Sequence, residues 1–227
     1  MKNRRLLGAG LALLSLTVSI SSVSASTSLY GNLGSVSAST TSNTVGYLSP
    51  GLLNQFQAQG FTLGAYDYDL TSLDFGLDAS GAPSPVAQLF GDNSGAPGSA
   101  LATFTLSSAV GTKGIYNFTG SFAAQKNTSY WVVLSNANSA SFESFEWYSN
   151  DSFTAPTGLN DSLITYLGTA ESNNGALWPN TLPSLSIQVN GELSAIPEPS
   201  SSMASLCLLA GGTLVRRRAR RVAQRSC

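Results

Sequence analysis

Short stretches in which apolar and polar residues alternate fill the middle of the chain and restrict the folds open to it. Leu73, Phe75 and Leu77 alternate with Ser, Asp and Gly. The same alternation recurs at Ala102, Phe104 and Leu106, at Phe145 and Trp147, and at Leu185, Ile187 and Val189. Because successive side chains of a strand point to opposite faces, this period of two predicts strands with one buried face. No stretch of this region has a long 3.6-residue period, so we do not expect helices there.

One stretch is apolar without alternation. Tyr130-Trp131-Val132-Val133-Leu134 would present apolar side chains on both faces of a strand, which predicts a central strand. Residues 78–81 and 92–98 are rich in Gly, Asp, Asn, Ser and Pro, as turns are. Together these patterns predict one all-β domain over residues 26–195, an antiparallel β-sandwich that is jelly-roll-like.

The net charge of −1 conceals an uneven distribution. Nine of the eleven basic residues lie near the two ends of the chain, whereas residues 26–195 hold only Lys113 and Lys126 against eleven acids. This body therefore carries a charge of −9. Nucleic-acid binding needs clustered Lys and Arg that displace counterions, so the acidic body argues against it.

Histidine is absent from the sequence, and cysteine is absent from the body. The lack of His removes the usual catalytic triads, His general bases and nearly all zinc sites. No serine lies three positions before Lys113 or Lys126, so the Ser-x-x-Lys signature is missing. Cys207 and Cys227 both lie in the C-terminal tail, so packing alone must stabilise the body. We expect no catalytic residues, no metal and no cofactor, and a protein that is not an enzyme.

The first 25 residues are organised like a secretory signal peptide. Lys2, Arg4 and Arg5 precede an uncharged apolar stretch, residues 6–20, and Val23-Ser24-Ala25 supplies the small residues that signal peptidase accepts. We expect cleavage after Ala25. The alternative is an uncleaved membrane anchor, for which the apolar stretch is shorter than the ~20 residues of a spanning helix.

The C-terminal tail combines three features in a fixed order. Pro197-Glu198-Pro199 is followed by sixteen uncharged residues, 200–215, and then by the arginines Arg216, Arg217, Arg218, Arg220 and Arg221. Sixteen helical residues would span about 24 Å, slightly less than a ~30 Å hydrocarbon core, and the adjacent arginines can snorkel to cover the difference. Arginines stay on the cytoplasmic side, which places the acidic body outside the inner membrane. The prolines impose an extended approach that a processing enzyme could grip.

This tail closely resembles the PEP-CTERM sorting signal of Gram-negative bacteria, which marks a protein for an exosortase. The resemblance rests on Pro197, Glu198 and Pro199, and on the length and charge of the segment after them. It implies processing by exosortase near the motif, a membrane-held intermediate, and release or reattachment at the outer surface. A plain stop-transfer helix with a chance Pro-Glu-Pro is the alternative. A eukaryotic lipid-anchor signal would end hydrophobic, not with arginines.

The order of segments in the body resembles a second bacterial group, the choice-of-anchor R domain. The matching stretches are residues 59–62, 70–77, 86–90 leading into 92–98, and 128–134. The resemblance spans about residues 29–188. It implies export and a β-sandwich, and it brings no established activity.

Two sets of carboxylates have the chemistry for a site. Glu143 and Glu146 come nearest to a glycosidase pair, but residues three apart on a strand face opposite sides. Hard oxygen ligands for calcium could come from four aspartates: Asp67, Asp69, Asp74 and Asp78. No fixed calcium loop is present. Charges on strands and turns that serve only solubility are the alternative for both sets.

Aromatic residues could form a platform that stacks on sugar rings. The candidates are Trp131, Trp147, Trp178, Tyr130 and Tyr148. We expect Trp131 and Phe145 in the core. Tyr148 and Trp178 sit among polar, Pro and Gly residues, so they are the candidate ligand aromatics.

These observations predict an exported, non-enzymatic surface or extracellular-matrix protein of a Gram-negative bacterium. Its partners would be signal peptidase, exosortase and, before processing, the membrane. Two alternatives remain open. One is an exopolysaccharide-binding module, with calcium as a further option, and the other is a carboxylate-dependent glycan hydrolase.

Overall fold

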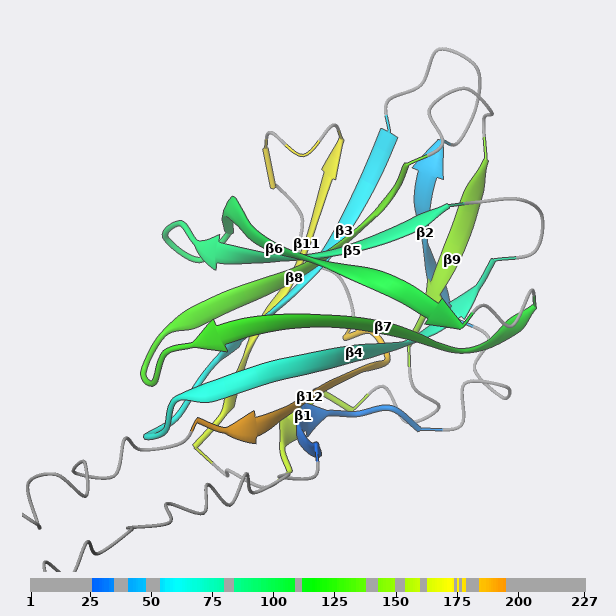
Figure 1. Ribbon diagram of the computed structural model, residues 1–227. Helices are drawn as coiled ribbons and strands as arrows, with labels where there is room; N and C mark the ends of the chain where they lie inside the picture. Colours follow the sequence, from blue (N-terminus) through cyan, green and yellow to red (C-terminus); the bar gives the residue numbers. More distant parts are fainter. Residues whose placement is uncertain are drawn as a thin grey trace, which may run out of the picture.

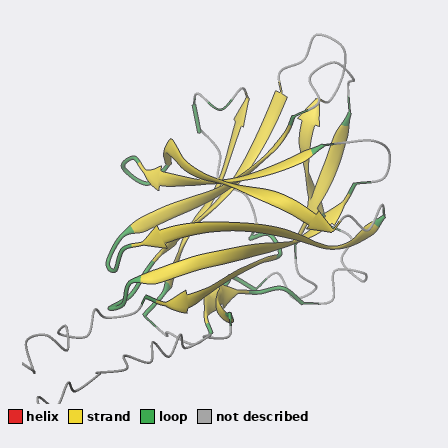
Figure 2. Cartoon of the chain, in the orientation of Figure 1, coloured by secondary structure: helices red, strands yellow, loops and turns green. Residues whose placement is uncertain are grey.

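The computed structural model describes residues 26–34, 41–47, 54–79, 84–108, 112–137, 143–149, 154–159, 163–173, 175, 177–178 and 184–194. In this part of the chain every regular element is a strand, as Figure 2 shows in yellow. The prediction of an all-β body is therefore confirmed. The predicted signal peptide and the predicted membrane helix lie outside the described residues.

Twelve strands make up the described body, and most of them are labelled in Figure 1. All of their pairings are antiparallel. Their bounds are β1 (Thr27–Gly31), β2 (Ser42–Tyr47), β3 (Asn54–Thr62), β4 (Tyr68–Asp78), β5 (Pro85–Asp92), β6 (Pro97–Ser108), β7 (Lys113–Ala124), β8 (Ser129–Asn136), β9 (Ser144–Tyr148), β10 (Thr157–Gly158), β11 (Thr165–Asn173) and β12 (Ile187–Leu193).

Hydrogen bonds close eight of these strands into a barrel. The order is β4-β7-β6-β5-β8-β3-β2-β9, and β9 returns to β4 with Trp147 opposite Leu77. Four strands extend this ring, because β12, β1 and β10 continue from β4 while β11 pairs with β3. The antiparallel arrangement is as predicted, but the strands form a closed barrel with additions where we expected a jelly-roll-like sandwich of two sheets.

The long strands provide the physical reason for this difference. β4 shares its second edge between two partners, since residues 68–75 pair with β12 and residues 77–78 pair with β9. One edge of β3 is divided in the same way, since residues 54–55 pair with β2 and residues 57–62 pair with β8, while β11 pairs along the other edge. Register shifts in the β4–β7 and β6–β7 pairs bend these strands, as bulges do. A barrel and a sandwich need the same alternation of apolar and polar residues, so the sequence pattern could not separate them.

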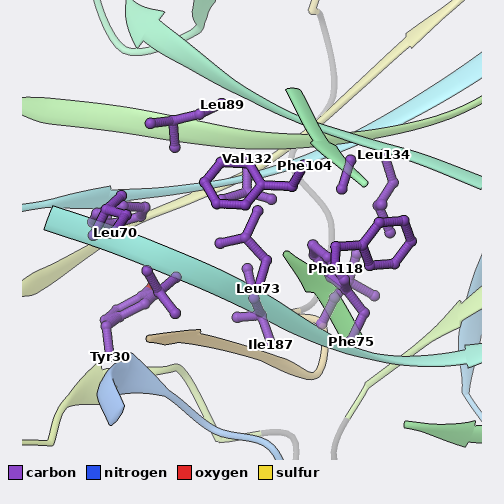
Figure 3. Packing of buried hydrophobic residues seen from close by; sticks show 14 of the residues in the cluster. Tyr30, Leu70, Leu73, Phe75, Leu89, Phe104, Phe118, Val132, Leu134 and Ile187 are labelled. Atoms are coloured by element: carbon purple, nitrogen blue, oxygen red, sulfur yellow. The ribbon is translucent and has the colours of Figure 1, made fainter. Parts of the chain in front are cut away.

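The main hydrophobic core is formed by side chains of the barrel strands together with Tyr30 of β1 and Ile187 of β12 (Figure 3). Phe75 of β4 belongs to this core, with its ring 5.3 Å from that of Phe118 on β7 and 5.2 Å from that of Trp147 on β9. Both contacts are edge to face, which is a favoured geometry for aromatic pairs. Leu89 and Val132 approach from the opposite wall, on β5 and β8. The residues that alternated in the sequence therefore meet in one core.

β8 is buried on both faces, as its continuous apolar sequence predicted. It lies between β5 and β3. Tyr130, Val132 and Leu134 belong to the main core, whereas Trp131 and Val133 belong to a second, smaller cluster on the other face. The expectation that Trp131 and Phe145 are core residues is confirmed, since each is 2% exposed.

The first and the last strand are neighbours. β1 pairs with β12, with Thr27 opposite Gly191, and the two lie together at the lower edge of Figure 1. Just after β12, the backbone N–H of Ser194 donates to the carbonyl oxygen of Asp67 at 3.0 Å. The two ends of the described body therefore lie side by side, with only short stretches between them and the predicted processing sites.

Candidate functional site

The residues predicted to direct export lie outside the described part of the chain. They are Ala25, Pro197, Glu198, Pro199 and the arginines Arg216, Arg217, Arg218, Arg220 and Arg221. Within the described residues, no helix is long and apolar enough to cross a membrane.

Tyr148, the first candidate ligand aromatic, lies at the end of β9 beside the start of β7. The Nζ atom of Lys113 stands 3.9 Å from the centre of the Tyr148 ring, which is the geometry of a cation–π contact. Desolvation raises the pKa of the Tyr148 phenol, and the negative charges of Asp78 and Glu146 raise it further. A hydrogen bond with Ser42 opposes this shift of the pKa. One face of the ring is therefore already in contact with a lysine.

Trp178, the second candidate aromatic, packs against the smaller hydrophobic cluster of Ala58, Trp131, Val133 and Ala170. That cluster belongs to β3, β8 and β11, whereas Tyr148 contacts Lys113 of β7 and pairs with Ser42 of β2. The two aromatics therefore lie over different strands. Of the five aromatics of the predicted sugar-stacking platform, Trp178 thus packs against the cluster that contains Trp131, whereas Tyr148 contacts Lys113.

The carboxylates singled out in the sequence have local partners. Glu146 accepts a hydrogen bond from the Thr44 hydroxyl at 2.9 Å, and Asp67 accepts one from the backbone N–H of Lys126 at 2.7 Å. Asp74 accepts from side-chain amides of Asn117 and Asn190. Among the described residues, no three carboxylate or other ligating side chains are grouped closely enough to hold a metal ion.

An open groove lies at the end of the barrel where the β5–β6 and β7–β8 hairpins turn. It consists of two depressions, of about 570 Å³ and about 540 Å³, which share Gly91, Asp92 and Leu101. Phe122 and Tyr130 line the first depression, and residues of the β5–β6 turn line the second. We call this joined depression the hairpin groove.

Asp92 is the only charged residue among those that line the hairpin groove in the described part of the chain. Its Oδ1 atom accepts a hydrogen bond from Nε1 of the buried Trp131 at 2.7 Å. Its carboxylate also accepts from the backbone N–H of Gly95 at 3.2 Å. Ser94 and Gly95 have φ angles of 56° and 85°, and these left-handed conformations fold the turn back toward Asp92. The carboxylate is thus held in one orientation at the rim of the groove.

No pattern in the sequence predicted this groove. The pattern predicted a turn over residues 92–98, and the structure has a shorter one, residues 93–96, between β5 and β6. Trp131 is buried, as predicted. The available signal was the polarity of a tryptophan: a buried indole N–H needs an acceptor, and an Asp at the start of a turn is a suitable one. No sequence pattern, however, indicates that strand β5 brings residue 92 beside residue 131.

The fold and the groove define an acidic, antiparallel β-barrel protein with an open polar depression at one end. No protein-family model matches the chain, and no curated protein or solved structure matches it either.

Proposed function

We propose that this chain is an exported, non-enzymatic surface or extracellular-matrix protein, delivered by an exosortase-type C-terminal sorting signal. One observation carries the proposal: Pro197-Glu198-Pro199, sixteen uncharged residues and an arginine cluster follow one another directly. The length of the uncharged segment 200–215 and the arginines that follow it suit a short membrane helix whose cationic end stays in the cytoplasm. The acidic body would then lie outside the inner membrane.

The boundaries of the folded body agree with this division of the chain. β1 begins at Thr27, two residues after the predicted cleavage at Ala25, and β12 ends at Leu193, four residues before Pro197. All described strands lie between these limits. Removal of both predicted processing segments would therefore leave the twelve strands of the barrel and its additions covalently intact.

The chemistry of the body also supports an extracellular, non-catalytic role. Only Lys113 and Lys126 would remain as basic residues after both ends are removed, so the mature body would carry a charge near −9. A protein far from zero net charge resists association and stays dispersed. Asp67, Asp74 and Glu146 are each engaged by donors of the protein itself, which favours structural roles for them.

The aromatic-platform version of the carbohydrate-binding alternative loses support, because Tyr148 and Trp178 lie over different strands. For the hydrolase alternative, Asp78 of β4 stands opposite Glu146 of β9. Glu146 accepts a hydrogen bond from Thr44, and neither carboxylate lines the hairpin groove, so this pair gives the alternative no support. We therefore retain neither version as a second function.

A test of the sorting proposal follows the protein through cell fractions in a Gram-negative host that has an exosortase. We expect Glu198→Gln, and separately deletion of residues 200–227, to remove the protein from the outer surface. The motif variant should accumulate in the inner membrane, because the helix would hold it there uncut. Glu192→Gln is the matched control, since Glu192 is a nearby carboxylate within β12. Unchanged surface display of both sorting variants would contradict the proposal.

A further inference from the structure

We infer that the hairpin groove is a binding site for a neutral glycan chain, with Asp92 as its central hydrogen-bonding group. The inference goes beyond the proposed sorting function and does not depend on it. It rests on the shape of the groove, the chemistry of its lining and the way in which Asp92 is held.

The shape suits a chain more than a single small molecule. Two depressions of similar size, about 570 Å³ and about 540 Å³, are joined at Gly91, Asp92 and Leu101. Both are open to solvent. An extended oligomer could therefore lie across the joined depression and continue beyond it, with Asp92 near the middle of the contact.

The lining is dominated by neutral hydrogen-bonding groups. They are contributed by Asn93, Ser99, Gln125, Asn127, Thr128 and Ser129. Amides and hydroxyls both donate and accept, as sugar hydroxyls require. No basic residue lines the groove among the described residues, and its one charge is negative, so phosphate and acidic polysaccharides are disfavoured.

Two apolar side chains in the groove are complementary to the C–H face of a sugar ring. Leu101 is 47% exposed at the junction of the two depressions, and Phe122 is partly buried in the wall of the first. The C–H face of a sugar ring can pack on such groups while its hydroxyls reach the amides. An exposed leucine in an otherwise polar groove is explained by this pairing of apolar and polar contacts.

Asp92 is prepared for this role before any ligand arrives. The indole of Trp131 is 2% exposed and donates to Oδ1, and the Gly95 N–H bridges both carboxylate oxygens. A carboxylate has about four acceptor positions, and these donors use three of them, so Oδ2 keeps capacity for a sugar hydroxyl. Because the group is already oriented, binding costs little side-chain entropy.

The contact between Trp131 and Asp92 also supplies a direct readout. Titration of the full-length chain in detergent with cellohexaose, laminarihexaose and mannohexaose should change the tryptophan fluorescence with at least one of them. A hexamer of galacturonic acid serves as the acidic comparator and should bind at least tenfold more weakly.

Paired variants locate the site. Asp92→Asn keeps an acceptor oxygen for Trp131 and should preserve the fold, and Leu101→Ala removes an exposed side chain. We expect each to weaken glycan binding at least tenfold. The matched controls are Asp69→Asn, an exposed carboxylate on β4, and Leu167→Ala, a leucine that is 41% exposed on β11. Equal melting temperatures would show that all four variants are folded.

Three results would overturn the inference: no binding of any neutral hexamer, equal or tighter binding of the acidic hexamer, or equal losses in the groove variants and the controls. The sorting proposal has a separate measurement, the distribution of the protein among cell fractions. Failure of one proposal is therefore distinguishable from failure of the other.

Discussion

Trp131 shows how one side chain connects the interior of this protein to its surface. Its ring lies against the backbone of Gly60 on the neighbouring strand β3, and its indole N–H reaches Asp92 at the rim of the hairpin groove. A Cβ atom at position 60 would stand 2.9 Å from ring atoms of Trp131. Glycine is therefore required there by close packing against the indole.

Replacement of Gly60 by Ala should lower the free energy of unfolding by about 1–3 kcal/mol, the usual cost of forcing an extra carbon into a packed core. Chemical denaturation followed by circular dichroism measures the change. Gly91→Ala is the control, because a Cβ atom there would meet Leu101 at an ordinary 3.7 Å. Equal stability of the Gly60→Ala protein and the original would show that the indole can move aside.

Tyr30 illustrates the effect of burial on a titratable residue. Its side chain is 1% exposed, its hydroxyl donates to the carbonyl oxygen of Gly60 at a long 3.4 Å, and its ring packs 5.2 Å from that of Phe61. Burial raises the pKa of the phenol, and the nearby Tyr166 raises it further. Ionised Tyr30 is thus disfavoured in the folded protein.

This shift predicts a loss of stability at alkaline pH. The pKa of Tyr30 is higher in the folded than in the unfolded chain, so its contribution is complete below pH ~10, the unfolded value, and falls as the pH rises above it. We expect Tyr30→Phe to flatten this fall, measured as the free energy of unfolding between pH 8 and 11. Tyr66→Phe, at a side chain that is 54% exposed, is the control. Identical pH profiles for both variants would contradict the expectation.

At the scale of the elements, a polar network joins the outer faces of β12, β4 and β7. Asp74 of β4 accepts from Asn117 of β7 on one oxygen and from Asn190 of β12, at 2.7 Å, on the other. Asn190 also donates to Ser72 at 3.0 Å and accepts from Ser28 of β1 at 3.2 Å. The network therefore extends from the barrel wall to the first and the last strand.

Asp74→Ala should lower the free energy of unfolding by about 1–3 kcal/mol, since the amides of Asn117 and Asn190 would lose their shared acceptor. Urea denaturation provides the measurement. Asp69→Ala changes an exposed carboxylate on the same strand and should have little effect. An equal loss of unfolding free energy in both variants would mean that negative charge on β4, not the hydrogen-bond network, determines the stability.

At the scale of the whole molecule, the first and the last described strand pair with each other at one side of the barrel. β1 pairs with β12 and with the two-residue strand β10, so its longer pairing, with β12, forms only after the last described strand has been made. Pairing between such distant strands makes folding slow compared with proteins of local contacts. On the proposed export route, the body would complete its fold only after β12 has crossed the membrane.

The sequence by itself determined the type of structure and many of its buried residues. Alternation at Leu73, Phe104 and Ile187 placed strands correctly, and the apolar stretch around Val132 identified the central strand, because burial on one or both faces leaves a period that is local in the chain. The export signals were also legible as local patterns of charge and length, and they stay predictions that cell fractionation can test.

Only the tertiary structure decided how the strands close and where a groove forms. The barrel depends on β9 reaching β4, and the hairpin groove depends on Asp92 meeting Trp131, 39 positions away. Pairing and register arise from bends and packing between distant segments. A period of two is compatible with several pairings and several registers. The physical reason is that alternation specifies which face of a strand is buried but not which strand lies next to it.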